Sequence, residues 1–424
     1  MKSTAERTGA QGAALAAIAY FGPLAALLSA LDPVGPFFDI TMTSLLKERL
    51  HASAAEAATF RLLTALPVYA SCLFGFARDR WRPFGWGDRG HLLVFGLVTA
   101  AVMGWLALQP LEPSRLLVGV FAVMLATRFL MAAFQGALAR HAQSHAMSGR
   151  LAALWQFASF SVTLCGAIFA GVMAERSAPG TLFTIIGLMG AAVAAYACLR
   201  PPGTEQAGED TAATGAWGPA LRRLARHRAI YPAVIGMLLF QFSPAQGVVL
   251  QYYLVEGLGG SRASYGYWYA AFLAGFLPMF PLYGYLCARI RFDRLLRLSA
   301  CLAIPQMLPL LAADAPTTAV WLAVPVGMLG GLLWAALHDL AIRASPCGLQ
   351  GTLMMVISGV NVLGVRAGDL VGSHLYGSGG PAGFLSCVLL TTAVYGVLAL
   401  LLAVRPPAVP LHPDGVGGGD VADG

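Results

Sequence analysis

Stretches of about 20 predominantly apolar residues recur along the chain from Gln11 to Val404, with only short polar breaks between them. A helix of that length crosses the roughly 30 Å of hydrocarbon in a bilayer. Every backbone amide inside a bilayer needs a partner within a helix or a closed barrel, and long apolar runs without alternation are not barrel strands. The sequence therefore predicts an all-α, polytopic membrane protein.

A central polar segment divides the apolar spans into two sets of six. We expect twelve transmembrane helices, at 11–39, 57–77, 91–108, 116–138, 151–173, 181–199, 230–255, 265–288, 295–312, 319–342, 352–376 and 384–404. The segment 201–219 is rich in Gly, Pro, Thr and acidic residues, which is typical of a flexible linker. The first span is long enough to be tilted or broken at Pro33 and Pro36.

This pattern predicts four regions of the chain. They are an N-terminal six-helix bundle at 11–200, a cytoplasmic linker with a basic amphipathic segment at 201–229, a C-terminal six-helix bundle at 230–405 and a flexible cytoplasmic tail at 406–424. The basic segment ALRRLARHR, at 220–228, suits an interfacial helix on anionic lipid. Simple retention of positive charge on the inner side explains it equally well.

Composition excludes several other classes of protein. Only 11% of the residues are charged and 58% are hydrophobic, whereas a soluble domain carries about a quarter charged residues. The net charge of +7 does not indicate nucleic-acid binding, because the basic residues flank apolar spans instead of forming an exposed stripe. No catalytic or phosphate-binding motif accompanies the spans, and the pair His141 and His145 has no acidic or cysteine ligand nearby. We therefore expect no enzymatic activity, metal site or cofactor.

The basic residues also predict orientation. With both termini inside, most of them fall on the cytoplasmic side, and the opposite side receives only Lys47, Arg49, Arg61, Arg115, Arg176 and Arg262. The expected location is the cell membrane (inner or plasma), with both termini cytoplasmic and lipid as the surrounding partner.

Two loops at matching places in the two halves share a pattern. The first is GFARDR from Gly75, and the second is GYLCAR from Gly284. This pattern resembles the loop signature of the major facilitator superfamily, whose members are twelve-helix transporters built from two pseudo-symmetric bundles. The resemblance implies that Gly75, Asp79 and Arg80 form a cytoplasmic gate. In the second loop Ala288 replaces the acid.

A narrower resemblance runs through residues 44–81, Gly85 and Arg89, and again through 345–376. These stretches are similar to the folate/biopterin transporter family, and the muropeptide permease and light-harvesting assembly families share parts of them. The resemblance implies a second helix kinked at the step from Leu66 to Pro67. It also implies a pteridine-like or other planar organic anion as substrate.

Buried charge indicates where a substrate or proton binds, because Asp or Arg at mid-membrane costs about 2.5–3.5 kcal/mol and normally faces a partner or a cavity. In the superfamily, helices one, four, seven and ten line the central cavity. We therefore expect Asp32 to meet Arg128, with Gln135 on the same side of its helix. A static ion pair that only stabilises the N-terminal half is the alternative. Asp39 lies near the outer boundary, where it can be solvated.

The second half offers further polar candidates. On the eleventh span the expected site residues are Asn361, Arg366 and Asp369, where the spacing of the last two lets them neutralise each other. On the seventh span they are Gln241 and Tyr252, with Pro244 able to unwind the helix between them.

The sequence thus predicts a monomeric secondary transporter that moves a small organic solute by alternating access, with a proton or another ion as coupling partner. One alternative is a drug or metabolite exporter of the same superfamily. Another is a membrane assembly or pigment-delivery factor on the same fold that transports nothing.

Overall fold

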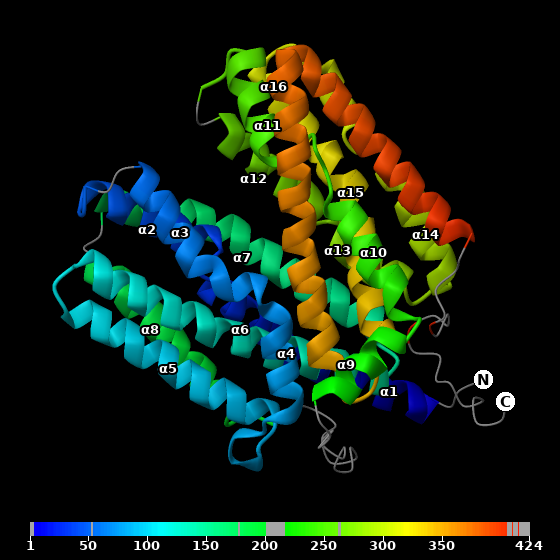
Figure 1. Ribbon diagram of the computed structural model, residues 1–424. Coiled ribbons are helices and arrows are strands. Elements are labelled where there is room, and N and C mark those ends of the chain that lie inside the picture. The colour runs from blue at the N-terminus through cyan, green and yellow to red at the C-terminus, as the bar shows by residue number, and fades with distance from the viewer. Residues whose placement is uncertain are drawn as a thin grey trace. The chain divides into compact units, whose positions relative to one another are not determined.

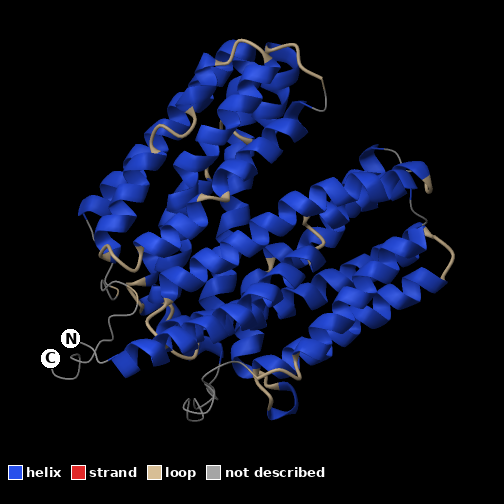
Figure 2. Ribbon diagram, turned by 180° about the vertical axis from the view of Figure 1, so that it is seen from behind, coloured by secondary structure: helices blue, strands red, loops and turns tan. Residues whose placement is uncertain are grey.

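The computed structural model describes residues 4–51, 54–176, 179–200, 217–261 and 264–404, together with positions 409 and 414. Across these residues the ordered elements are helices, and no strand occurs among them (Figures 1 and 2). Residues 201–216 of the expected flexible linker at 201–219, and the expected tail apart from Val409 and Asp414, lie outside the described residues.

The helices follow the apolar spans closely. In the first half they are α1 (Thr4–Leu31), α2 (Pro36–Glu48), α3 (Ala54–Tyr69), α4 (Ser71–Arg80), the short η1 (Pro83–Gly85), α5 (Asp88–Leu108), α6 (Pro113–Ser144), α7 (Ser148–Arg176) and α8 (Pro179–Tyr196). In the second half they are α9 (Trp217–Arg226), α10 (Ile230–Gln241), α11 (Gly247–Tyr252), η2 (Tyr253–Gly257), α12 (Ser264–Phe276), α13 (Met279–Leu286), α14 (Phe292–Ala303), η3 (Leu308–Ala312), α15 (Pro316–Ala344) and α16 (Gln350–Val404).

Each of the twelve expected spans corresponds to one or more of these helices. Eight described helical segments are long and apolar enough to cross a membrane, and the bent pair α3–α4 makes a ninth. The three other spans correspond to α7, to α8 and to α10 with α11. The last two spans form α16, where the non-helical backbone of Gly380 separates them. The prediction of an all-α, polytopic membrane protein is confirmed.

Three spans are broken where proline predicts a break. The first span is interrupted over Asp32–Gly35, between α1 and α2, where Pro33 removes a donor. The second bends by 40° between α3 and α4, just after Pro67, as the family resemblance implies. The seventh is interrupted around Pro244, between α10 and α11. These breaks free backbone groups within the membrane, and such groups are tolerated where protein or water satisfies them.

The chain forms two compact units. Unit 1 contains Met1–His141, Ala158–Arg222 and Pro346–Val356, and unit 2 contains Ala142–Phe157, Arg223–Ser345 and Ile357–Gly424. The first turns of α7 thus pack in unit 2, and the first turns of α16 pack in unit 1.

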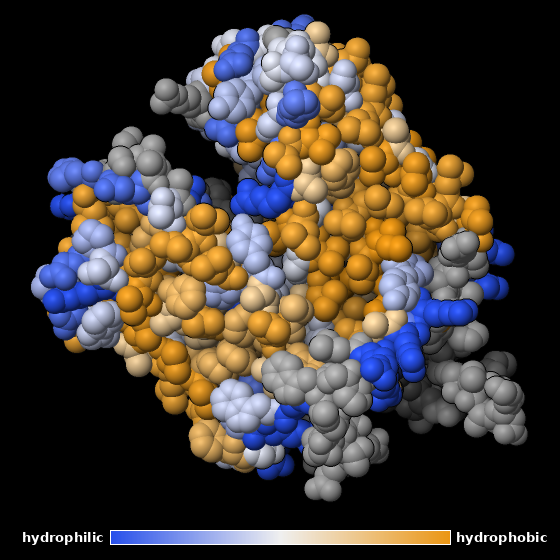
Figure 3. Space-filling view, in the orientation of Figure 1, coloured by the Kyte–Doolittle hydropathy of each residue, from blue (hydrophilic) through white to orange (hydrophobic). Residues whose placement is uncertain are grey.

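Large apolar side chains cover much of the exposed surface. Figure 3 shows broad areas of hydrophobic residues over the helices on the visible face. Strongly exposed examples from several helices are Leu15, Leu97, Trp321, Leu370 and Leu400. A soluble monomer rarely exposes large contiguous apolar patches, so this surface fits contact with lipid.

Candidate functional site

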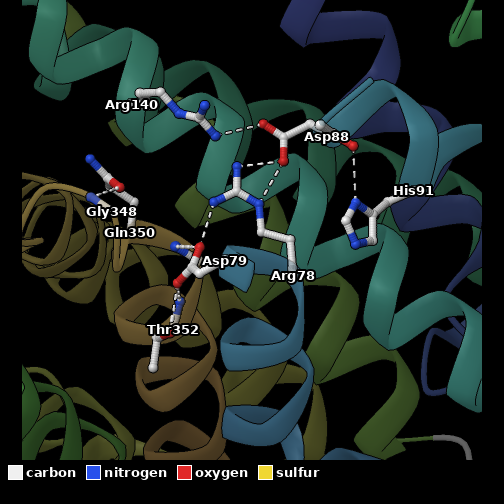
Figure 4. A network of polar contacts seen from close by, with 10 residues as sticks. Arg78, Asp79, Asp88, His91, Arg140, Gly348, Gln350 and Thr352 are labelled. Atoms are coloured by element: carbon white, nitrogen blue, oxygen red, sulfur yellow. Dashed lines mark hydrogen bonds and ion pairs between the residues drawn. The ribbon is translucent and has the colours of Figure 1, made fainter. Parts of the chain in front are cut away.

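Asp79, near the end of α4, caps the beginning of α16 within unit 1 (Figure 4). Its Oδ2 accepts hydrogen bonds from the backbone N–H of Thr352 at 2.7 Å and from the Thr352 hydroxyl at 2.6 Å. Its Oδ1 accepts one from the N–H of Gly351 at 3.2 Å. The first N–H groups of a helix have no partner inside it and carry partial positive charge, so a carboxylate stabilises them.

A second carboxylate completes a network of ion pairs around Asp79. Arg78 donates from Nη1 to Asp79 at 2.6 Å and from Nε to Asp88 at 2.6 Å. Arg140 of α6 donates to the other oxygen of Asp88 at 2.8 Å (Figure 4). Asp79 and Arg78 are almost fully buried, so each charge depends on its partners in the network. We call Arg78, Asp79, Asp88 and Arg140 the unit 1 latch.

Gly75 allows α4 to approach the first turns of α16. A Cβ atom at this position would overlap the carbonyl oxygen of Gly351 and lie 2.9 Å from Cβ of Met355. The guanidinium of the expected gate residue Arg80 lies 4.3 Å from the ring centre of Phe76. The arginine at the centre of the network is Arg78.

The expected pair of Asp32 and Arg128 is present in unit 1. Asp32 lies in the break between α1 and α2, where its carboxylate is 2.5 Å from Nη2 of Arg128. Arg128 is 6% exposed, and its buried Nε has no hydrogen-bond partner among the described residues. The pair therefore combines a broken span, two opposite charges and a donor that remains available to an acceptor.

Two other residues of unit 1 bear on this pair. Gln135 is buried on α6, the helix that also carries Arg128. Asp39, which the sequence places near the outer boundary where it can be solvated, forms an ion pair of 2.7 Å with Arg61. Both of those side chains remain about half exposed.

In unit 2 the structure brings together two of the expected site residues. Nε2 of Gln241, the last residue of α10, donates to Oδ1 of Asn361 on α16 at 2.6 Å. The contact lies where the seventh span breaks. Tyr252 belongs to α11 beyond the break, and its ring centre is 6.4 Å from that of Tyr376.

The other two candidates on α16 lie beside the start of α11. Oδ1 of Asp369 accepts a hydrogen bond of 3.3 Å from the N–H of Val248. Arg366 and Asp369 form the expected ion pair, at 3.6 Å, with Arg366 largely exposed. Asp369 thus faces backbone groups that the break in the seventh span leaves without helical partners.

Sequence reasoning missed part of this site. The expected site residues did not include four residues that hold Asp79 in place, directly or through Arg78: Arg78, Asp88, Arg140 and Thr352. A signal was available in the run from Arg78 to Asp88, where three arginines and two aspartates lie together at a span end.

Comparisons with known proteins agree with this architecture. The sequence profile of the family described as the Major Facilitator Superfamily matches residues 12–365. No match to a curated protein is found.

Among solved structures, the chain is similar to the fucose:proton symporter FucP of E. coli, with a TM-score of 0.68, 16% identity and coverage of 92% of this chain and 98% of that chain. It is similar to the human organic anion transporter MFSD10, with a TM-score of 0.62, 14% identity and coverage of 91% and 98%. It is also similar to the proton:xylose symporter XylE, with a TM-score of 0.65, 12% identity and coverage of 94% and 98%. At these identities the likeness concerns the fold alone.

Proposed function

The chain belongs to the Major Facilitator Superfamily, and from this premise we propose that it is a secondary active transporter that moves a small organic anion by alternating access, coupled to protons. The family and the fold point to a transporter rather than an enzyme. We further propose that residues 11–200 and 230–405 are the two bundles that move against each other. The proposed location is the plasma or inner membrane, with both termini in the cytoplasm.

The ion pair of Asp32 and Arg128 is the observation that carries this proposal. Each charge in a membrane span costs about 2.5–3.5 kcal/mol, so such pairs mark substrate or proton pathways more often than chance placement would. This pair lies at a helix break, and broken helices are typical of binding sites in transporters.

The geometry suggests how a proton and an anion are coupled. When ionised, the Asp32 carboxylate holds the Arg128 guanidinium through Nη2. Protonation of Asp32 removes the negative charge and leaves Arg128 free to bind an anionic group of the substrate. The unpartnered Nε of Arg128 supplies a further donor, so a carboxylate could bind with two parallel hydrogen bonds.

The substrate class follows from this charge together with the family resemblance. An arginine with an available planar edge suits a carboxylate, and buried Gln135 lies on the same helix. The similarity of residues 44–81 and 345–376 to folate/biopterin transporters makes pteridine-like anions the first compounds to test. Gln241, Tyr252 and Asn361 are the proposed contacts from unit 2.

The experiment is uptake of radiolabelled folate and biopterin into proteoliposomes with and without an imposed pH gradient. We expect gradient-dependent accumulation by the wild type and its loss in Asp32→Asn and Arg128→Gln. Asp39→Asn is the matched control, because Asp39 is another acid near the first break whose partner is a half-exposed arginine.

Equal accumulation by wild type and Asp32→Asn would remove Asp32 from the mechanism. Absence of flux for every compound, in either direction, would favour the assembly-factor alternative. Flux of other organic anions would keep the transporter and change the substrate class.

A further inference from the structure

The second half of the chain contains a loop that corresponds to residues 75–80 of the first half but has no acidic residue at the position of Asp79. Gly284 and Arg289 match Gly75 and Arg80, whereas Ala288 occupies the position of Asp79. A helix begins against this loop in unit 2 as well. In unit 1 that helix is α16, and in unit 2 it is α7.

The helix beginnings match residue for residue. Gly351 and Gly149 are each the second residue of their helix, and Thr352 and Arg150 are each the third. A Cβ atom at Gly351 would lie 2.8 Å from Cδ of Arg78, and one at Gly149 would lie 2.7 Å from Sγ of Cys287. Arg78 and Cys287 directly precede Asp79 and Ala288, so the two loops meet the two helices at the same register.

A carboxyl group nevertheless caps α7, and it comes from the C-terminal segment. Oδ2 of Asp414 accepts a hydrogen bond of 2.9 Å from the N–H of Arg150. This is the same helical position from which Asp79 accepts at Thr352. The N–H of Asp414 donates to the carbonyl oxygen of Cys287 at 3.0 Å, which fixes Asp414 to the loop that lacks the acid.

Charged residues of α15 surround Asp414. Its Oδ1 is 2.8 Å from Nη2 of Arg343, and Nε of Arg343 is 2.8 Å from Asp339. Asp339 in turn accepts a hydrogen bond of 2.8 Å from the Tyr283 hydroxyl. The side chain of Asp414 is 1% exposed, so it is docked as deeply as Asp79. We call Cys287, Asp339, Arg343 and Asp414 the unit 2 latch.

We propose that Asp414 supplies, from the C-terminal segment, the gate carboxyl group that the second loop lacks, and caps α7 as Asp79 caps α16. Asp414 is thus a positioning residue that acts through α7. The role of this contact in gating rests on the proposed transport function: docking of Asp414 holds the proposed cytoplasmic gate of the second half. The docking itself is independent of transport.

Cysteine labelling tests the docking in the full-length protein. The thiol of Cys287 is buried, with Sγ 3.5 Å from Oδ2 of Asp414, whereas Cys347 is exposed and Cys387 is buried elsewhere in unit 2. Pulsed N-ethylmaleimide labelling read by peptide mass spectrometry follows all three thiols in one sample. We expect Asp414→Ala to raise labelling of Cys287 about tenfold, the equivalent of one lost buried hydrogen bond, with Cys347 and Cys387 unchanged.

Three further variants separate docking from general damage. Asp414→Asn retains an acceptor oxygen for the Arg150 N–H and keeps Cys287 shielded. Asp293→Asn, which alters a largely exposed cluster of Arg291 and Arg297 in the same unit, also leaves Cys287 shielded. Ala288→Asp alone adds a competing carboxyl group beside Asp414 and increases labelling of Cys287.

The double variant Ala288→Asp/Asp414→Ala tests substitution of one acid by the other. We expect it to regain the thermal stability and the initial rate of uptake that Asp414→Ala loses, while Cys287 remains labelled because the C-terminal segment is undocked. Unchanged labelling of Cys287 in Asp414→Ala would overturn the docking. If Cys287 is labelled in Asp414→Ala but thermal stability neither falls in that variant nor recovers in the double variant, the claim that one acid replaces the other is overturned. If the wild type moves no compound but labelling and stability behave as expected, the transport proposal fails and this inference stands.

Discussion

The two latches perform the same capping of a helix with different arrangements of charge. In the unit 1 latch two arginines, Arg78 and Arg140, face two carboxylates, Asp79 and Asp88, so the charges of these four residues balance. In the unit 2 latch, among the residues that the structure describes, the guanidinium of Arg343 is shared by Asp339 and Asp414. Asp79 belongs to α4, next to the start of the helix that it caps, whereas Asp414 lies beyond the last span. We infer that the first latch is a permanent part of unit 1 and that the second can open.

The largest expected effect is that of Asp79→Ala. This change removes the acceptor of the Gly351 and Thr352 donors and leaves Arg78 with one partner fewer in a buried site. Loss of one partner from a buried charge pair costs about 3–5 kcal/mol. A lowered midpoint of thermal denaturation in detergent, together with loss of uptake, is the expected result. A midpoint equal to that of the wild type would contradict the structural role of the unit 1 latch.

Replacing an arginine should cost more unfolding free energy in the unit 2 latch, at Arg343, than in the unit 1 latch, at Arg140. Arg343 is buried and serves two carboxylates, so Arg343→Gln should cost about 3–5 kcal/mol of unfolding free energy. Arg140 is 38% exposed, and Asp88 keeps Arg78, so Arg140→Gln should cost about 0–1 kcal/mol. Thermal denaturation of the two variants side by side measures the difference. Equal losses of unfolding free energy in the two variants would contradict the expectation that the buried arginine contributes more than the exposed one.

The matched glycines sharpen the comparison at the level of packing. Gly75→Ala forces a methyl group into the backbone of Gly351 and should cost about 1–3 kcal/mol, with reduced uptake. At Gly284 a Cβ atom would lie 3.4 Å from Cβ of Ala153, an ordinary contact, so Gly284→Ala should be tolerated. Initial rates of uptake and denaturation midpoints report both variants. A more severe defect in Gly284→Ala than in Gly75→Ala would reverse the assignment of the tighter helix contact.

The unit 2 latch has two carboxyl groups on one arginine, and this imbalance predicts that only the unit 2 latch responds to pH near neutrality. Burial, together with the Asp339 carboxylate, raises the pKa of Asp414 from 3.8 to about 6, against the opposing effect of Arg343. Since the docked carboxyl group binds its proton more tightly than the undocked one, docking is strongest below pH 4 and weakens as pH rises through about 6. Between pH 5 and 7.5 the docking constant should fall about tenfold.

Labelling of Cys287 relative to exposed Cys347 measures this change. Asp414 faces the Cys287 thiol, Arg343 and Asp339 of α15, and the backbone N–H of Arg150 on α7. Tyr283 of α13 donates to Asp339. The ratio should rise from pH 5 to pH 7.5 in the wild type and stay constant in Asp414→Asn. A ratio that is constant in both proteins would show that Asp414 does not titrate on docking.

The sequence was sufficient for features that act locally. Pro33 and Pro244 predicted the breaks in the first and seventh spans, because proline removes a helical donor, and the family resemblance implied the kink next to Pro67. The cost of burying charge in a membrane, together with the helices that line the cavity in the superfamily, predicted the pair of Asp32 and Arg128.

Contacts between segments far apart in the sequence could not be predicted from local sequence features. Asp414 and Arg150 are 264 positions apart, and an aspartate in a polar C-terminal segment carries no local signal of burial. Arg78 was missed for a related reason: adjacent arginines at a span end all satisfy the positive-inside rule, and only the packing of α4 selects the one that meets Asp79.

The most direct test of the central claim separates proton coupling from solute movement in one protein. Substrate exchange across proteoliposomes without a pH gradient requires binding and alternating access, whereas gradient-driven accumulation also requires the coupling group. With a transported organic anion, we predict that Asp32→Asn retains exchange and loses accumulation, since Arg128 is then permanently free of a charged partner. Accumulation by Asp32→Asn at the wild-type level would contradict the account.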